Sequence, residues 1–155
     1  MFIVLHNIRS AYNVGAIFRT ADATGVKKIY LTGYTPTPTD RFGRTQQEIK
    51  KTSLGASETV PWEQLDFEEA VEALHKEGAT VVAIEQADSS QDIRAYKTEG
   101  EIAYVFGNEV TGIEEAELKL VDAIVELPML GTKESLNVSV TAGVVMYHEI
   151  LTSNT

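Results

Sequence analysis

The chain has 155 residues, of which 43% are hydrophobic and 23% charged, as is typical of a soluble domain with one buried core. Cysteine is absent, which excludes disulfides, thiolate catalysis and thiolate-bound zinc. No apolar run is long enough to span a membrane, and we expect no signal peptide. Because the three histidines are widely spaced, we expect no metal site, and the composition as a whole favours a cytoplasmic protein.

The net charge of −10 argues against a polyanionic partner for the chain taken as a whole. Residues 1–55, however, contain eight basic and three acidic residues, a net charge of +5, which leaves −15 for the remainder. This asymmetry has two interpretations. Either the helix faces carry charge by chance, or the first third of the chain forms a local basic face that binds phosphates.

Along the chain, apolar runs that predict strands alternate with amphipathic segments that predict helices. The predicted strands lie at residues 2–5, 28–32, 80–84, 101–106 and 121–127, with a brief edge strand at residues 59–62. The predicted helices lie at residues 13–24, 44–51, 66–77 and 135–151. Uninterrupted apolar strands between helices indicate a mainly parallel sheet with helices on both faces. We therefore predict one α/β domain over residues 1–155.

The ends of two predicted helices carry recognisable capping residues. Asn13 is a good N-cap for the first helix, and Gly25 is expected to end it. Asp66 is followed by Glu69, which predicts a capping box at the start of the third helix. Between the second strand and the next helix, residues 33–43 are rich in proline and turn residues, and a loop of this length suggests a function.

Three predicted strands run into segments of unusual composition, at residues 85–86, 107–112 and 128–143, the last of which passes into the predicted helix at residue 135. In open α/β sheets ligands bind at the carboxyl ends of strands, so we expect a ligand where these loops meet. Glycines at 107, 112 and 131 are expected to let that ligand approach the backbone closely. Neither a P-loop nor the dinucleotide-binding glycine pattern is present. The last loop leads into an almost wholly apolar helix, which is predicted to be buried.

The first predicted helix contributes Asn13 and Arg19, and each has a structural interpretation beside a chemical one. Asn13 is explained by helix capping alone. Arg19 is explained equally well by an ion pair with Asp22, three residues further along the helix. The residue types and their spacing leave both interpretations open.

Three segments resemble the motifs of the SpoU (TrmH-type) RNA ribose methyltransferases of the SPOUT superfamily. The first is residues 7–21, with Asn13-Val14-Gly15 and Arg19-Thr20-Ala21. The second is the run Phe-Gly-Asn-Glu-Val-Thr-Gly-Ile at residues 106–113. The third runs from Leu-Pro-Met at residues 127–129 to Ser-Leu-Asn-Val-Ser-Val at residues 135–140. The motifs occur in the family's order and spacing and cover essentially the whole chain.

The resemblance implies an α/β domain whose C-terminal part forms a deep trefoil knot. It also implies a homodimer with an active site completed across the interface, and methyl transfer from S-adenosylmethionine to a ribose 2′-hydroxyl of RNA. By motif position, the catalytic residues would be Arg19, Asn13, Glu109, Ser135 and Asn137. The residues holding the cofactor would be Glu85, Gly107, Leu127, Met129, Ser135 and Leu136.

The role of Arg19 in such a reaction stays open at this point. A guanidinium hardly loses its proton in proteins, so a role as general base requires help from an RNA phosphate. The alternative is that Arg19 clamps a phosphate and stabilises the alkoxide charge that develops on the ribose.

The chain also departs from the better-known members, since it shows neither an N-terminal RNA-binding extension nor a long C-terminal helical one. RNA binding is then expected to rest on Arg9, Arg41, Arg44, Lys50, Lys51 and Lys133. A compact chain is similar to the minimal members that modify tRNA, including those acting at the anticodon wobble ribose, so tRNA is the expected substrate. The alternatives are ribosomal RNA, or a knotted module that binds S-adenosylmethionine or RNA without turnover.

Overall fold

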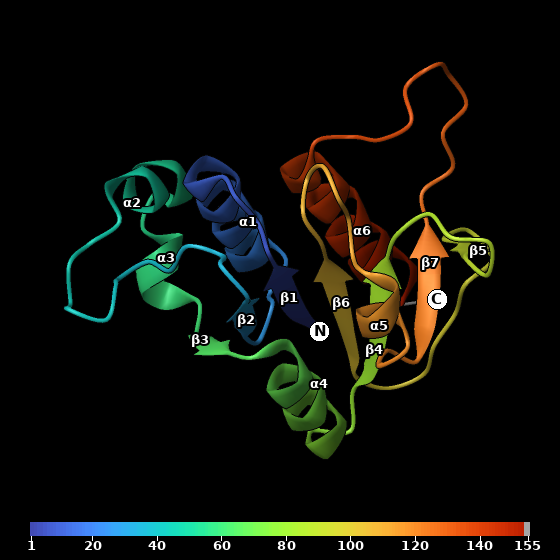
Figure 1. Cartoon of the computed structure of the whole chain (residues 1–155), viewed down its shortest axis with the longest axis horizontal. Helices are drawn as coiled ribbons and strands as arrows, with labels where there is room; N and C mark the ends of the chain where they lie inside the picture. Colours follow the sequence, from blue (N-terminus) through green and yellow to red (C-terminus); the bar gives the residue numbers. More distant parts are fainter. Residues whose placement is uncertain (154–155) are drawn as a thin grey trace.

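The computed structural model describes residues 1–153, in which seven strands form one sheet between two layers of helices (Figure 1). The strands are β1 (Phe2–His6), β2 (Ile29–Thr32), β3 (Trp62–Leu65), β4 (Thr80–Ile84), β5 (Gln91–Asp92), β6 (Ile102–Phe106) and β7 (Ala123–Glu126). The helices are α1 (Ala11–Ala23), α2 (Gln47–Ser53), α3 (Ala56–Thr59), α4 (Phe67–Lys76), α5 (Glu115–Leu118) and α6 (Val138–Thr152). The strand order is β3-β2-β1-β6-β4-β7-β5, and every pairing between these strands is parallel. The predicted α/β class and parallel sheet are confirmed.

Both faces of the sheet are covered, because successive residues of a strand point to opposite sides. Ile3 and Leu5 of β1 belong to the cluster that includes residues of α1 and α6, whereas Phe2 and Val4 belong to the cluster that includes α4. All five residues of β1 are buried, as are all five of β6. This double burial explains the uninterrupted apolar runs in the sequence. Among residues 1–153, no helix is both long and apolar enough to cross a membrane.

Helix α1 begins two residues before Asn13, so the predicted cap is wrong. Ser10 is the N-cap, and its hydroxyl accepts a hydrogen bond from the backbone N–H of Asn13 at 3.2 Å. Serine and asparagine cap helices about equally well, so composition did not distinguish them. The consequence is that the Asn13 side chain is buried and available for other contacts. The capping box predicted at Asp66 and Glu69 is confirmed.

The elements between β2 and α4 differ from the prediction. Residues 33–46 contain no helix or strand, and α2 begins at Gln47 because a bridge between Thr39 and Thr45 keeps the preceding residues extended. The predicted edge strand at residues 59–62 is displaced towards the C-terminus, since α3 includes Thr59 and only Trp62 of the predicted range belongs to a strand. β3 begins only after Pro61, which has no N–H to donate to the sheet, and pairs with β2 at the edge.

Two short elements, β5 and α5, were not predicted from the sequence, and the start of α6 also differs from the prediction. β5 has two residues and α5 has four, too few for either to show a hydrophobic period. α6 begins at Val138 rather than at residue 135, and Asn137 is its N-cap. The helix is buried on one face only. Opposite the core, a stripe is 44–71% exposed and consists of Val140, Val144, Tyr147 and Leu151.

Candidate active site

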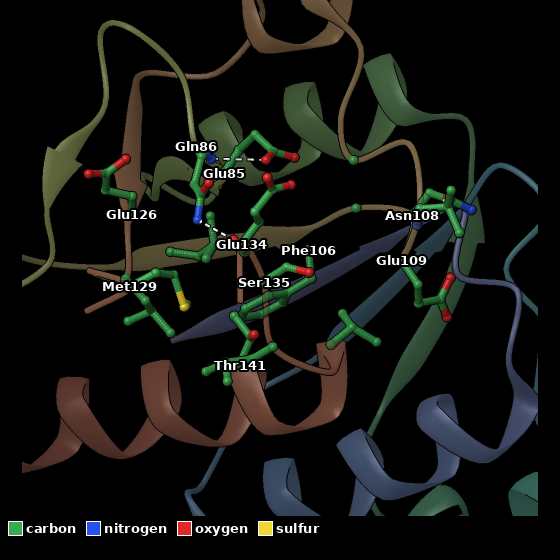
Figure 2. A pocket seen from close by; sticks show the side chains of 17 residues that line it. Glu85, Gln86, Phe106, Asn108, Glu109, Glu126, Met129, Glu134, Ser135 and Thr141 are labelled. Carbon is green, nitrogen blue, oxygen red and sulfur yellow. Dashed lines mark hydrogen bonds between the residues drawn. The ribbon is translucent and has the colours of Figure 1, made fainter. Parts of the chain in front are cut away.

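A cavity of about 310 Å³ lies at the carboxyl ends of β4, β6 and β7, where the three unusual loops meet (Figure 2). The sheet is parallel, so these strand ends share one edge, and the segment between β7 and α6 closes one side of the cavity. The volume is within the range of small-molecule sites. All six residues predicted to hold a cofactor line it, namely Glu85, Gly107, Leu127, Met129, Ser135 and Leu136.

The wall of this cavity is acidic and partly apolar. Its lining residues include four glutamates, Glu85, Glu109, Glu126 and Glu134, and none of the described lining residues is a lysine or an arginine. Its apolar wall is formed by Ile84, Phe106, Val110, Leu127, Met129, Leu136 and Val138. A wall of this kind favours a ligand that joins positive charge to an apolar part, and it disfavours a phosphate.

Hydrogen bonds tie the loops around the cavity to one another. The Glu85 carboxylate accepts from the backbone N–H of Gln86 at 2.9 Å and from that of Ile113 at 3.1 Å. The side-chain amide of Gln86 donates to the Glu134 carbonyl at 2.7 Å (Figure 2). The end of β4 therefore holds both the segment after β6 and the segment before α6. Gln86 and Glu134 lie in loops that the sequence singled out, but neither was predicted to hold the cofactor, and Glu126 was not singled out at all.

The glycines of the second loop, which line the cavity, also have a packing role within the chain. A Cβ atom on Gly107 would lie 2.8 Å from the carbonyl carbon of Gly112, and one on Gly112 would lie 2.2 Å from a Glu85 carboxylate oxygen. Gly112 also has a φ of +68°. The missing side chains thus allow the loop to pack against itself and against Glu85. Around Gly131, no atom of the described chain lies within 4 Å of such a Cβ.

Three of the predicted catalytic residues form a chain of hydrogen bonds beside the cavity. The Asn137 amide donates to the Asn13 side-chain oxygen at 3.3 Å, and the Asn13 amide donates to the Glu109 carboxylate at 3.4 Å. The pKa of the Glu109 carboxyl is lowered overall. Burial alone would raise it, but the carboxylate accepts hydrogen bonds from backbone N–H groups, including those of Arg9 and Ser10, and from the Asn13 amide. Together these hydrogen bonds outweigh the effect of burial. Glu109 is therefore an ionised anchor joining the first, second and third motif segments.

Asn108 is a buried residue of this region that the sequence analysis missed. Its amide nitrogen donates to the carbonyl of Asn7 at 2.9 Å and to the Tyr34 hydroxyl at 2.8 Å. Its amide oxygen accepts from the backbone N–H groups of Val110 and Thr111. Asn108 thus holds the loop that carries Glu109 against the end of β1. Its position between Gly107 and Glu109 in the second motif was the available signal.

Arg19 lies outside the cavity, in a second hollow on the helical face. The described residues lining that hollow are Tyr12, Ala16, Arg19, Thr20, Ala23, Lys51, Thr52, Leu54 and Tyr147. Among the described residues Arg19 forms no ion pair, so the pairing with Asp22 allowed by the sequence does not occur. A catalytic role for Arg19 would require it to lie near the bound cofactor, but within one chain Arg19 is not among the residues that line the cavity.

The residues predicted to bind RNA are exposed on the surface. Among residues 1–153, five of the six have no ion-pair partner, namely Arg9, Arg41, Lys50, Lys51 and Lys133. Arg44 pairs with Asp40 at 2.7 Å. Elsewhere in the first third, Lys27 and Lys28 are neutralised by Glu101 and Glu63. The positive charge that remains available is therefore concentrated on the segments predicted to meet RNA.

Two relatives show what the sequence is similar to. The chain is 34% identical over 152 residues to the tRNA (guanosine(18)-2′-O)-methyltransferase of Thermus thermophilus, an alignment that covers 94% of this chain and 71% of that protein. It is 31% identical over 147 residues to the 23S rRNA (guanosine-2′-O-)-methyltransferase RlmB of Neisseria meningitidis, covering 94% of this chain and 56% of RlmB. The chain spans little more than half the length of the RlmB relatives that it matches.

Solved structures share the fold. An rRNA methyltransferase from Sinorhizobium meliloti with bound AdoMet superposes with a TM-score of 0.85 at 26% identity, covering 95% of this chain and 54% of that one. A structure described as giving insights into 2-OH methylation of C/U34 on tRNA superposes with a TM-score of 0.81 at 26% identity, covering 98% and 96%.

The three motif segments identified in the sequence therefore surround one cavity or lie against its edge, in a fold shared with RNA methyltransferases. A sequence model of the family described as the SpoU rRNA Methylase family matches residues 1–147, nearly the whole chain. This match confirms the resemblance drawn from the motifs, and the chain belongs to the SpoU rRNA methylase family.

Proposed function

We propose that this protein transfers a methyl group from S-adenosylmethionine to a ribose 2′-hydroxyl of tRNA. The observation that carries the proposal is the acidic, partly apolar cavity, since the second and third motifs of the family line it together. The names of the relatives support it, because both describe RNA 2′-O-methyltransferases. The AdoMet-bound structure with the same fold supports the cofactor.

The residues of the cavity fit this cofactor chemically. S-adenosylmethionine supplies a methyl group on a positively charged sulfonium and also carries an ammonium group and an adenine. The four glutamates of the wall suit the positive charges, and Phe106, Leu127 and Met129 suit the adenine. We propose that backbone groups near Leu127, Met129 and Leu136 hold the adenine and ribose.

The protein's own contribution is to orient the ribose hydroxyl and to assist the loss of its proton. We propose that Ser135 and Asn137 face the ribose, and that Asn13 and Glu109 hold Asn137 through the hydrogen-bond chain described above. Because a guanidinium is a poor general base in proteins, we propose that Arg19 clamps the neighbouring phosphate and stabilises the negative charge developing on the 2′-oxygen. The 2′-oxygen would form its bond to the methyl carbon as the carbon–sulfur bond breaks and its electron pair returns to the sulfur, which would leave as a neutral thioether. The hydroxyl proton would pass to solvent or to a phosphate oxygen.

We propose that the active protein is a homodimer formed through α1 and α6. The exposed stripe on α6 adjoins the hollow that contains Arg19, because Tyr147 belongs to both. Tyr12 and Leu54 line the same hollow and are also largely exposed. Exposed apolar side chains that adjoin one another are expected to be covered by a partner, and a two-fold contact would bring the partner's cavity towards Arg19. We further propose that the C-terminal part forms the trefoil knot implied by the family.

The proposal favours tRNA over ribosomal RNA. The structure concerned with C/U34 of tRNA matches this chain over nearly the full length of both, which supports nucleotide 34 as the first position to examine. The similarity to RlmB keeps 23S rRNA as the alternative substrate. A tRNA substrate and a chain without cysteine both fit a reducing, cytoplasmic setting.

The test is to incubate the protein with S-adenosylmethionine labelled in the methyl group and with unmodified tRNA or ribosomal RNA. Labelled tRNA is then digested, and the modified nucleoside is identified by mass spectrometry. We expect one 2′-O-methylated ribose per tRNA. Binding of S-adenosylmethionine without transfer to either RNA would instead indicate a non-catalytic module.

The basic face makes a separate prediction. Reversing Lys50 and Lys51 to glutamate is expected to weaken tRNA binding strongly at low salt and to reduce the slope of log K against log salt. The physical reason is that both lysines are exposed on α2 and unpaired among the described residues. The control with the same charge change is Lys76→Glu with Lys97→Glu, outside the first third. Equal losses in the two double variants would place the RNA-binding face elsewhere.

A further inference from the structure

The loop between β2 and α2 ends in an ordered turn at residues 40–44. The Asp40 carboxylate accepts hydrogen bonds from the backbone N–H groups of Phe42 and Arg44 at 2.8 and 2.9 Å, and from the Arg44 guanidinium at 2.7 Å. The Asp40 backbone N–H also donates to the Arg44 carbonyl. A bridge between Thr39 and Thr45 closes the base of the turn. The turn therefore presents its tip in one conformation.

The tip carries an aromatic ring that the fold does not use. Phe42 is 66% exposed and belongs to neither hydrophobic cluster of the core. The guanidinium carbon of Arg41 lies 4.7 Å from the centre of its ring, and that of Arg44 lies 5.0 Å from it. An exposed aromatic ring with guanidinium groups beside it is a combination on which unpaired nucleic-acid bases stack.

We propose that Phe42, framed by Arg41 and Arg44, is a stacking platform for an unpaired base of the RNA substrate. The proposal rests on the proposed function for the identity of the RNA, and goes beyond it in assigning a base contact to this turn. The two arginines add phosphate attraction to the stacking surface, and Asp40 offsets only one of them.

The position of the turn favours RNA over a second copy of this chain. Figure 1 shows the segment between β2 and α2 projecting at the left edge of the molecule, beyond α2, whereas α6 lies on the other side of α1. The apolar stripe proposed for dimerisation is thus on a different side. The cavity at the ends of β4, β6 and β7 is also remote from the turn within one chain, so Phe42 is expected to act on RNA affinity and not on the chemical step.

The test compares the wild-type protein with Phe42→Ala, Phe42→Leu and Phe42→Tyr. Dissociation constants are measured by fluorescence anisotropy for an unmodified tRNA transcript and for a fully paired RNA duplex. Phe42→Ala is expected to raise the Kd and KM for tRNA about tenfold, the usual scale of one lost base stack, with kcat unchanged. Phe42→Leu, which keeps an apolar side chain but has no ring, is expected to lose as much. Phe42→Tyr is expected to retain wild-type affinity, and duplex binding is expected to be equal in all four proteins.

Several outcomes overturn the inference. Equal tRNA affinity in all four proteins excludes the platform, and equal weakening on tRNA and duplex indicates a contact other than stacking. Dissociation of the dimer by Phe42→Ala, seen in analytical ultracentrifugation, assigns the ring to a protein interface. A wild-type protein that binds tRNA without methylating it refutes the proposed function alone, because the affinities still decide the role of Phe42.

Discussion

Replacing Arg19 with alanine is expected to lower the rate of methyl transfer by about 10²–10³-fold, the usual cost of removing one group that stabilises developing charge. Affinity for S-adenosylmethionine should be unchanged, because Arg19 does not line the cavity at the strand ends. Isothermal titration of the cofactor and single-turnover methylation of tRNA measure the two effects separately. The split between binding and chemistry is what distinguishes a residue acting on the ribose from one that supports the cofactor.

Two further variants define what Arg19 does. Arg19→Lys keeps the charge but loses the forked guanidinium, so a clamp on a phosphate predicts partial activity. Arg94→Ala is a control with the same loss of charge, since Arg94 is exposed and pairs with Asp92 away from both hollows. A large loss of cofactor affinity in Arg19→Ala, or full activity in that variant, would refute the assigned role.

Much of the fold followed from the amino-acid pattern, because the long strands are buried on both faces. The run at residues 80–84 has no polar alternation, and in the structure it forms β4, an interior strand of the parallel sheet. The short elements β5 and α5 were not predicted, because two or four residues are too few to show a hydrophobic period. The start of α1 was misplaced because Ser10 and Asn13 are both good caps, and only the tertiary contact of Asn13 with Glu109 separates them.

The candidate site was predictable where motif and topology agreed. Parallel strand ends meet at one edge, so the loops after β4, β6 and β7 had to lie together, and their residues line one cavity. The contacts that organise the loops were not predictable, because each joins residues distant in sequence. The Gln86 amide reaches the Glu134 carbonyl across 48 positions, and Asn13 reaches Glu109 across 96. The local sequence also does not show that Gly107 packs against Gly112, or that Gly112 packs against Glu85.

The exposed face of α6 shows why a helix that is apolar all round was misread as buried. Val145 and Met146 are fully buried in the core, whereas Val144 and Tyr147 beside them are 45% and 44% exposed. A sequence cannot distinguish a helix buried within one chain from a helix buried between two chains. If a second subunit covers this open face, as we propose, it would also bring together Arg19 and a cavity that lie in separate hollows of one chain.

Two inactive variants are expected to restore activity when they are mixed. Arg19→Ala removes the proposed clamp, and Leu136→Arg places bulk and positive charge in the cofactor cavity, where it opposes a cationic ligand. If each site combines Arg19 of one subunit with the cavity of the other, a mixed dimer contains one intact site and one doubly defective site. An equimolar mixture that exchanges freely should recover about a quarter of the wild-type rate, because half of its dimers are mixed.

The measurement is methyl transfer to tRNA by each variant alone and after co-refolding, with the fold of each checked by circular dichroism. Val144→Asp supplies the matching control, since a charge on the exposed stripe of α6 should produce a monomer that binds S-adenosylmethionine but transfers no methyl group. Adding Val144→Asp to both variants should abolish the recovery. Recovery that persists without dimers, or no recovery from dimers that demonstrably exchange, would mean that Arg19 and the cavity act within one chain. The shared site is the expected result because, within one subunit, Arg19 lies in a different hollow from the cavity, together with Tyr147 of the exposed α6 stripe.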